Sequence, residues 1–301
     1  MEKKRNMKIL SIGSTNVDQT YYVDHFPQRG ETIRAISSRI TPGGKGLNQA
    51  VAIARSGGSV SFLSAIGSDK EGEYITDVLS KENIDTHLKE IPGISTGNAN
   101  IVVDSNGENK IIIVEGANGN INKKLLDDEN KLIVGSDIIV IQNEIEKATN
   151  EYIIGLAGKR KKIILWNPAP KGLINKKYFK FITYFTPNEN ELDYYVNNPN
   201  LSMEEKCHEL LESGIKNIIV TLGSRGVYYQ NNMVNGIIPA EKVHAIDTVC
   251  AGDTFNGYFI NAIACGKSFI DAIKIGNLAA SKAVQKKGAM NSIPYSDEVY
   301  C

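Results

Sequence analysis

Residues 247–257 combine small residues, an acid and the start of an apolar segment, in the order Asp-Thr-Val-Cys-Ala-Gly-Asp-Thr-Phe-Asn-Gly. Small residues at a helix start leave backbone N–H groups accessible, and the helix dipole adds positive potential, so Ala251 and Gly252 favour a bound anion. The carboxylate of Asp253 is then well placed to take a proton from a hydroxyl that attacks a phosphoryl group. This segment alone indicates equally that Asp253 or Thr254 only caps the helix.

A second candidate ligand site is the glycine-rich segment 42–50, Pro-Gly-Gly-Lys-Gly-Leu-Asn-Gln-Ala. Gly43 and Gly44 allow a ligand to approach the backbone closely. A helix is predicted to begin inside this segment, which places Asn48 in its first turn. The glycines, with Lys45 among them, favour a polar-ligand site over a flexible loop. The segment is not a P-loop, because the order Gly-x-x-x-x-Gly-Lys-Ser/Thr is absent.

Other polar residues follow predicted strands. Asn16 and Asp18 are two apart, so on an extended segment they face the same side and could hold vicinal hydroxyls. A turn explains them as well, and their spacing alone favours the turn. Glu144 could contact a sugar or begin a helix. Asn188 and Glu191 could organise Mg²⁺-bound water and phosphate, but as isolated residues they are more typical of a helix cap.

Composition narrows the classes of function. The chain has 301 residues, 42% of them hydrophobic, and a net charge of zero, which argues against nucleic acid as a partner. No apolar run approaches the roughly 18 residues needed to cross a bilayer, so no membrane association is expected. The cysteines at 207, 250, 265 and 301 form no Cys-x-x-Cys pair. A disulfide framework and a zinc site are therefore disfavoured, and the cytoplasm is the expected location.

The predicted elements alternate between strand and helix, which indicates an α/β fold with a mainly parallel sheet covered on both faces. Ligands in such folds bind beyond the carboxyl ends of the strands, where the polar residues fall. Two β-rich excursions, 18–41 and 95–117, interrupt the alternation. They could form one small sheet, a lid over the site, and the remaining ranges 1–17, 42–94 and 118–301 would form the large domain.

The chain resembles the PfkB (ribokinase-like) carbohydrate kinase family in segments that occur in family order over nearly its whole length. The glycine-rich form Gly-Gly-Lys-Gly-x-Asn-Gln leans toward the members that phosphorylate ribose. The matching segments are Asn16-Val-Asp18, Gly43-Gly-Lys-Gly-Leu-Asn-Gln49, Thr96-Gly97, Asn167-Pro-Ala-Pro170, Thr186-Pro-Asn-Glu189, Thr221-Leu-Gly-Ser-Arg-Gly226, Asp247-Thr-Val-Cys-Ala-Gly-Asp-Thr-Phe-Asn256 and Lys287-Gly288.

The resemblance implies a three-layer αβα sandwich with a small β-sheet lid, and ATP-dependent phosphorylation of D-ribose at its 5-hydroxyl. Asp253 would be the base, and amides around Ala251 and Gly252, beside Cys250, would form the anion hole. The implied ribose ligands are Asn16, Asp18, Gly43, Gly44, Lys45, Asn48 and Glu144. The implied ATP ligands are Asn188, Thr221, Gly223, Ser224, Gly226, Gly252 and Asn277, with Glu191 managing Mg²⁺.

The resemblance also implies an activating K⁺ and a homodimer formed through the lid sheets. An oxygen-only site suits such a hard cation. Its implied ligands are Asp247, the carbonyls of Val249, Ala283, Lys286 and Gly288, and the hydroxyl of Ser292.

Two departures from the family pattern stand out. Cys250 replaces the usual alanine, and its position at a helix N-terminus predicts a lowered thiol pKa and sensitivity to oxidants or alkylation. Asn98 and Asn100 occupy a lid strand that commonly packs apolar residues over the sugar. Kinases for deoxyribose, fructose or a nucleoside therefore stay open as alternatives. A non-catalytic sugar-binding protein is a further alternative, against which the intact Asp253 weighs.

Overall fold

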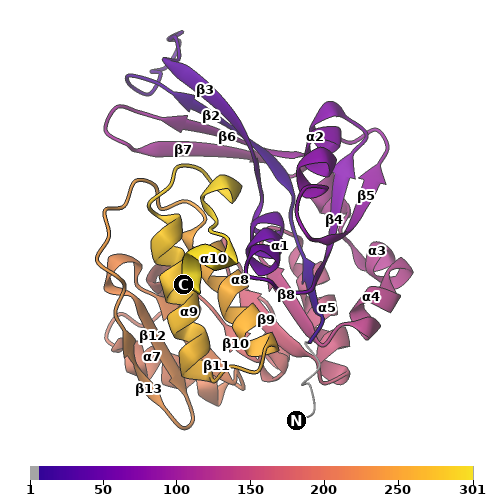
Figure 1. The fold of residues 1–301 in the computed structure, drawn as a ribbon, viewed down its shortest axis with the longest axis vertical. Helices are drawn as coiled ribbons and strands as arrows, with labels where there is room; N and C mark the ends of the chain where they lie inside the picture. The colour runs from indigo at the N-terminus through magenta and orange to yellow at the C-terminus, as the bar shows by residue number, and fades with distance from the viewer. Residues whose placement is uncertain (1–6, 301) are drawn as a thin grey trace.

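A nine-stranded sheet forms the centre of the molecule (Figure 1). The computed structural model describes residues 7–300 of the chain, so residues 1–6 of the expected large domain and Cys301 lie outside the described part. All neighbouring strands from β5 to β11 are parallel, and β12 and β13 add an antiparallel hairpin at one edge. In spatial order the strands are β13 (Asn235–Ile238), β12 (Val227–Asn231), β11 (Asn217–Thr221), β10 (Tyr184–Phe185), β9 (Ile163–Asn167), β8 (Ile138–Gln142), β1 (Ile9–Ile12), β4 (Val60–Gly67) and β5 (Asp85–Ile91).

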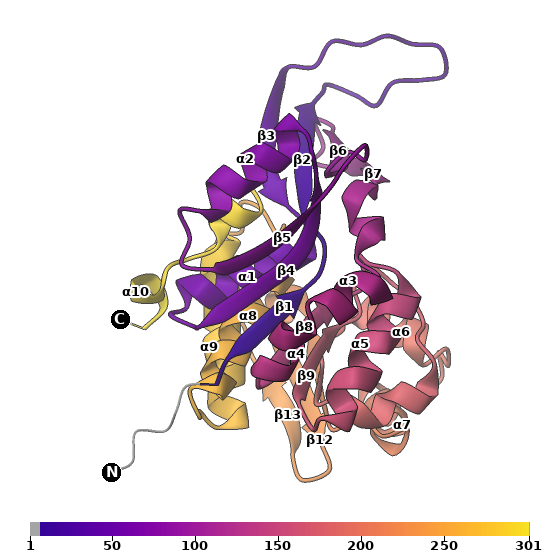
Figure 2. The same cartoon turned by 90° about the vertical axis from the view of Figure 1, so that its right-hand side faces the viewer.

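Helices cover both faces of this sheet, which confirms the three-layer αβα architecture (Figure 2). Each face has its own hydrophobic core, and successive residues of β1 show the division, because Ile9 belongs to one core and Leu10 to the other. On the first face lie α1 (Lys45–Arg55), α2 (Lys70–Leu79), α8 (Ala251–Ala264), α9 (Phe269–Ala283) and α10 (Ser296–Val299). On the second lie α3 (Lys123–Asp128), α4 (Asn130–Gly135), α5 (Lys147–Lys159), α6 (Glu189–Tyr195) and α7 (Met203–Glu212).

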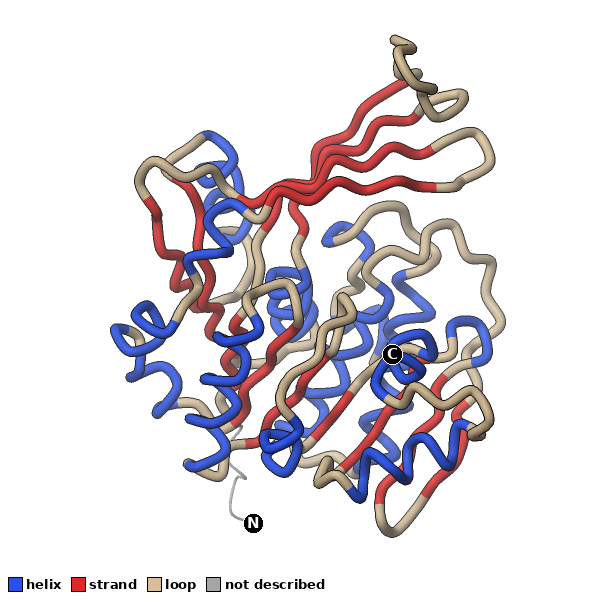
Figure 3. The backbone as a smooth tube through the Cα atoms, turned by 180° about the vertical axis from the view of Figure 1, so that it is seen from behind, coloured by secondary structure: helices blue, strands red, loops and turns tan. Residues whose placement is uncertain are grey.

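The two β-rich excursions meet in a second sheet of four strands, ordered β3-β2-β6-β7, which projects from the body of the molecule (Figure 3). β2 pairs with β3 antiparallel and with β6 parallel, so the two excursions are joined directly. β2 and β3 reach two residues beyond the expected boundaries 18 and 41. The strands are β2 (Asn16–Tyr22), β3 (Ser37–Gly43), β6 (Gly97–Val103) and β7 (Asn109–Val114).

The large domain shows the expected alternation of strands and helices, but not every element had a signal in the sequence. Edge strand β5 has the sequence Asp-Thr-His-Leu-Lys-Glu-Ile, whose polar residues gave no strand signal. No helix among residues 7–300 is long and apolar enough to span a bilayer.

Candidate active site

Asp253 lies in the first turn of α8 and is 5% exposed. Its carboxylate accepts a hydrogen bond from Gln49 Nε2 at 2.9 Å and another from Asn48 Nδ2 at 3.3 Å. Both donors belong to the first turns of α1, so the N-termini of two packed helices meet at this carboxylate. The arrangement brings together the two segments that the sequence marked as ligand sites.

Two first-turn amides of α8, those of Gly252 and Asp253, have no hydrogen-bond acceptor among the described residues. The amide of Ala251 donates to the Thr248 carbonyl at 3.4 Å, a long bond. The amides of Gly252 and Asp253 precede the first intrahelical donor, Thr254, which bonds to the Cys250 carbonyl at 2.9 Å. An added Cβ at Gly252 would meet no heavy atom within 4 Å. This helix start is therefore an open place for negative charge.

Under the small sheet lies a hollow of about 510 Å³ that contains most of the predicted sugar ligands. Asp18 projects into it from β2. An added Cβ at Gly43 would lie 2.1 Å from Asp18 Oδ2, so the glycine makes room for this carboxylate. The predicted ligands that line the hollow are Asn16, Asp18, Gly44, Lys45, Asn48, Glu144 and Asp253.

Glu144 connects the ends of three segments at this hollow. Its Oε2 accepts from Ser14 Oγ at 2.5 Å and from the backbone amide of Lys45 at 2.8 Å. On the other side of the hollow, Asn16 Oδ1 accepts from Asn118 Nδ2 at 2.8 Å. These bonds fix the side chains before any ligand arrives, as a preorganised binding site requires.

Three carboxylates and one lysine set the electrostatics of the site. Burial, followed by the charges of Glu144 and Asp253, raises the pKa of Asp18 to about 7. Burial also raises the pKa of Asp253, while the Lys45 ammonium opposes the change. The Asp253 charge in turn raises the pKa of Lys45. Lys45 is thus a permanent cation that favours the ionised form of Asp253.

A second hollow, of about 530 Å³, lies on the other side of the α8 N-terminus. A smaller hollow of about 230 Å³ adjoins both, since Asp253 and Lys45 also line the first hollow and Gly252 and Asn188 also line the second. The three hollows therefore form one continuous path, and Asp253 lies where the first hollow meets the small one. The predicted nucleotide ligands on the second hollow are Asn188, Thr221, Gly223, Ser224, Gly226, Gly252 and Asn277.

Three buried oxygen atoms on this path have no hydrogen-bond partner among residues 7–300: Asn48 Oδ1, Thr186 Oγ1 and Asn256 Oδ1. Asn48 lines the first hollow, whereas Thr186 and Asn256 line the small one. Buried polar atoms normally find partners, so these atoms indicate a polar ligand with hydroxyl or water donors.

Asn188 and Glu191 form a capping box at the start of α6. This confirms the helix cap, which these residues taken alone favoured over a ligand site. Glu191 Oε2 accepts from the Asn188 amide at 2.9 Å, and Asn188 Oδ1 accepts from the Glu191 amide at 2.8 Å. Both residues also line the small hollow, so the cap does not remove them from the site. Burial raises the pKa of Glu191.

The residues expected around K⁺ lie on two segments that Asp247 joins. Its Oδ1 accepts from the Val249 amide at 3.0 Å, and its Oδ2 accepts from the Gly288 amide at 2.9 Å. The Asp247 amide donates to the Val284 carbonyl at 3.2 Å. One carboxylate with several carbonyls and a hydroxyl fits a hard monovalent cation, and each oxygen keeps a further lone pair.

Comparison with known proteins identifies the family. The model of the pfkB family of carbohydrate kinases matches residues 6–295. The chain belongs to this family. This PfkB protein is 36% identical to the ribokinase of Haemophilus influenzae over 95% of both chains, and 32% identical to the deoxyribokinase of Salmonella typhi over 96% of both.

Solved structures agree with the fold of this PfkB chain. The ribokinase of Thermotoga maritima superposes with a TM-score of 0.91 at 38% identity, covering 98% of each chain. The Arabidopsis thaliana ribokinase complexed with ribose and ATP superposes with a TM-score of 0.90 at 28% identity, covering 98% of this chain and 97% of that one. The protein is accordingly a carbohydrate kinase, as the sequence predicted.

Two expectations about individual residues of the PfkB chain were wrong. Burial raises the pKa of the Cys250 thiol well above its usual value, and the Asp253 charge adds to the rise, so the helix N-terminus does not prevail. Asn98 and Asn100 face away from the sugar hollow, which β6 lines instead with Ala99 and Ile101. The β6 residues that face the hollow are therefore apolar, and they alternate with the asparagines along the strand.

Sequence reasoning also missed the residues that hold Asp253 in place. Gln142 Nε2 donates to Gln49 Oε1 at 2.7 Å, so the other end of Gln49 must donate, to Asp253 and to Asn167 Oδ1. Asn167 Nδ2 in turn donates to the Thr186 carbonyl at 2.8 Å. The sequence did contain a signal for these residues. Gln49 stands within the apolar run of a helix, and Gln142 ends an apolar strand.

Proposed function

We propose that this protein transfers the γ-phosphate of ATP to the 5-hydroxyl of D-ribose. The observation that carries the proposal is the position of Asp253, buried where the sugar-side hollow meets the hollow that reaches the open start of α8. The relatives named as ribokinases, one of them in complex with ribose and ATP, support the choice of both substrates.

In this mechanism Asp253 accepts the proton of the 5-hydroxyl as the oxygen attacks the γ-phosphorus and the bond to the β-phosphate oxygen breaks. Lys45 favours the ionised carboxylate that this role needs. The amides of Gly252 and Asp253, with the more weakly available amide of Ala251, stabilise charge on the phosphoryl oxygens. Cys250 sets the turn before these amides through its left-handed backbone, with φ of 67°.

The remaining side chains position the two substrates. Ribose lies in the hollow under the small sheet, which acts as a lid; its hydroxyls donate to carboxylates and exchange hydrogen bonds with amides. The ribose ligands are Asn16, Asp18, Lys45, Asn48 and Glu144, with the backbone at Gly43 and Gly44. The nucleotide ligands are Asn188, Thr221, Gly223, Ser224, Gly226, Gly252 and Asn277.

Mg²⁺ fits this arrangement as a companion of the nucleotide. No cluster of three or more His, Cys, Asp or Glu residues able to hold a metal occurs within residues 7–300. Mg²⁺ is commonly bound through one carboxylate, waters and substrate phosphates, and Glu191 supplies such a carboxylate. The ion would neutralise phosphate charge. K⁺ would be held by Asp247, Val249, Ala283, Lys286, Gly288 and Ser292, and would brace the loop before α8.

We also propose a homodimer through the lid. The side of the small sheet that faces the sugar hollow extends over β7, where Ile111 and Ile113 are 52% and 57% exposed. An apolar surface of this kind is typical of a protein interface. Sedimentation at micromolar concentration tests the dimer. If the Ile111→Lys variant is a monomer under the same conditions, the result supports this surface as the dimer interface.

A coupled assay of ADP release with ATP, Mg²⁺ and a sugar panel tests the proposed activity. Ribose is expected to give the highest kcat/KM in a panel with deoxyribose, fructose and nucleosides; a higher value for deoxyribose would favour the activity named for the Salmonella relative. Asp253→Asn is expected to lower kcat by about 10²–10⁴-fold while ribose still binds. The exposed Asp128→Asn variant serves as the control. Turnover by Asp253→Asn close to the parent would overturn the base assignment.

A further inference from the structure

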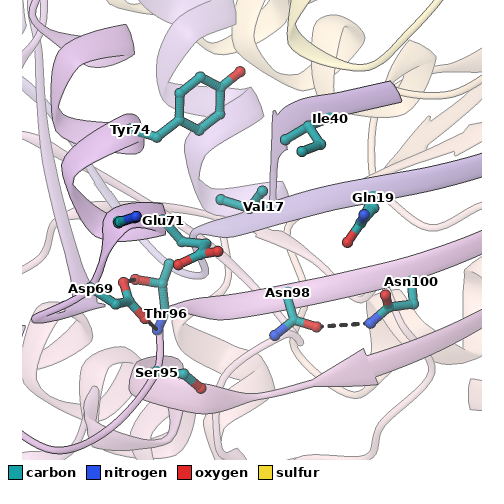
Figure 4. Close-up of a pocket in the computed structure, with 11 residues that line it drawn as sticks. Val17, Gln19, Ile40, Asp69, Glu71, Tyr74, Ser95, Thr96, Asn98 and Asn100 are labelled. Carbon is teal, nitrogen blue, oxygen red and sulfur yellow. Dashed lines mark hydrogen bonds between the residues drawn. The ribbon is translucent and has the colours of Figure 1, made fainter. Parts of the chain in front are cut away.

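A separate cavity of about 590 Å³ lies on the outer face of the small sheet, opposite the sugar hollow (Figure 4). Its walls are the outer side chains of β2, β3 and β6, the N-terminal half of α2 and residues 95–96. It shares no lining residue with the three hollows around Asp253. The lining residues are Val17, Gln19, Ile40, Asp69, Lys70, Glu71, Tyr74, Ser95, Thr96, Asn98 and Asn100.

Three carboxamides dominate the polar part of this cavity. Gln19 and Asn100 are partners across the β2–β6 pair, and Asn98 lies two residues before Asn100 on the same face. Asn100 Nδ2 donates to Asn98 Oδ1 at 3.0 Å, as Figure 4 shows. Within the described residues the Gln19 side chain has no partner, and Asn98 keeps its NH₂ group and Asn100 its carbonyl oxygen for another molecule.

These carboxamides are not explained by the stability of the sheet. Asparagine is depleted in strands, where β-branched and aromatic residues pack better. On the opposite side of β6, Ile101 and Val103 follow that rule, and Ala99 is apolar as well. A pair of asparagines at alternate positions of one strand face therefore suggests recognition rather than packing.

The rest of the cavity determines which ligand chemistry it suits. The Tyr74 ring, Val17 and Ile40 supply an apolar side, as Figure 4 shows. Amides combined with an aromatic or aliphatic surface suit the polar edges and apolar faces of a sugar.

The charges of the lining argue against an anionic ligand. Asp69 is already bonded within the protein, since its carboxylate accepts from the amides of Gly72 and Thr96 and from Thr96 Oγ1. Glu71 and Lys70 are both exposed at the entrance, so the cavity as a whole has no excess of positive charge. A phosphorylated or nucleotide ligand would find no cation cluster here.

We propose that this outer cavity is a second binding site, for a neutral polyhydroxy compound. Only the small sheet separates the outer cavity from the inner hollow, because consecutive residues of β2 line opposite sides of it: Val17 and Gln19 line the outer cavity, and Asn16 and Asp18 line the inner hollow.

Nuclear magnetic resonance of the ¹⁵N-labelled protein tests the site, with D-ribose and ribitol as probes. The side-chain NH₂ signals of Gln19, Asn98 and Asn100 report on the outer cavity, and the amide of Gly44 reports on the inner hollow. With at least one probe, the outer signals are expected to shift along a saturable curve whose midpoint differs from that of Gly44. Failure of the Gly44 signal to respond to D-ribose would count against the proposed function, and not against the outer site.

The double variant Asn98→Val/Asn100→Val is expected to weaken outer binding, as followed by the Gln19 signal, by about tenfold or more, since it removes two hydrogen-bonding groups. Ser38→Val, on the same face but outside the cavity, is the matched control and should bind as the parent does. Gln19→Val, followed by the Asn98 signal, provides a second test if the double variant does not fold. Outer signals that follow the Gly44 midpoint with both probes, or that do not saturate up to about 100 mM of either, would overturn the proposal.

Discussion

Replacing Gln49 by leucine is expected to move the pH dependence of the reaction. Gln49 donates to Asp253 Oδ1 at 2.9 Å, and this hydrogen bond holds the pKa of the buried carboxyl below the value that burial alone would give. Leucine keeps the apolar contacts of the side chain and removes the donor. The pKa of Asp253 should therefore rise, and the base should be protonated at higher pH than in the parent.

The magnitude follows from the strength of one charged hydrogen bond. Such a bond contributes about 1.5–3 kcal/mol, and one pKa unit corresponds to about 1.36 kcal/mol, so the expected rise is about one to two units. Asn48 still donates at 3.3 Å, which places the expectation nearer to the lower figure. The acidic limb of the plot of kcat against pH should move to higher pH by that amount. At pH values well above this limb, kcat of Gln49→Leu should return to most of the parent's value.

The assay is ADP release between about pH 5 and pH 10, with sugar and ATP saturating at each pH. Gln49→Leu also leaves Gln142 Nε2 without its acceptor, so a loss of stability of about 1–3 kcal/mol accompanies the change. Gln230→Leu is the matched control: Gln230 is also buried, accepts from the Tyr228 hydroxyl at 2.6 Å and lies in β12. It should lower stability without moving the limb.

A limb that stays within about 0.3 pH units of the parent in Gln49→Leu would refute the reasoning, because the lost bond would then contribute under about 0.4 kcal/mol to the ionised form. A uniform fall in kcat at every pH would refute it too, since that result describes misplacement of the base and not a change in its proton affinity.

Three further predictions concern single side chains. The pKa of Asp18 is about 7 in the folded protein, against an ordinary value of 3.8 for an aspartate, so the native state holds an extra proton and stability falls as pH rises between these values. Asp18→Asn should therefore be more stable than the parent at pH 8, by up to about 4 kcal/mol, and similar to it near pH 3 in urea unfolding. Equal stability at pH 8 would contradict the assigned burial of that charge. Cys250 is buried and Cys265 exposed, so iodoacetamide should label Cys265 first by peptide mass spectrometry; prior labelling of Cys250 would contradict its raised pKa. Asp247→Ala should abolish any difference in kcat between K⁺ and Na⁺, while Asp128→Asn should preserve it.

The sequence predicted the large-scale organisation well because its signals are local. The alternation of strands and helices depends on residues a few positions apart, as do the Ser202–Glu205 capping box of α7 and the Ser268 cap of α9. The two excursions could be recognised as β-rich in the same way. Their pairing into one sheet required the additional inference that both flank the same site.

The errors share a physical cause, which is that facing and burial are properties of the tertiary structure. Strand periodicity states that Asn98 and Asn100 share a face, but a shift of one residue exchanges the two faces, and nothing local selects between them. Cys250 shows the same limit, because the helix dipole is visible in the sequence whereas the packing that desolvates the thiol is not. The role of Gln49 was not predicted because its partners, Gln142 and Asp253, are 93 and 204 residues away in the sequence.

The raised pKa values of Asp18 and Asp253 have a common consequence for the order of events at the site. Without a ligand, Asp18, Glu144 and Asp253 repel one another and are compensated mainly by Lys45. A sugar whose hydroxyls donate to Asp18 and Asp253 stabilises their ionised forms and lowers the pKa of both. Binding of the acceptor should therefore release protons near pH 7 and leave Asp253 ionised, which is the form that its proposed role as the base requires.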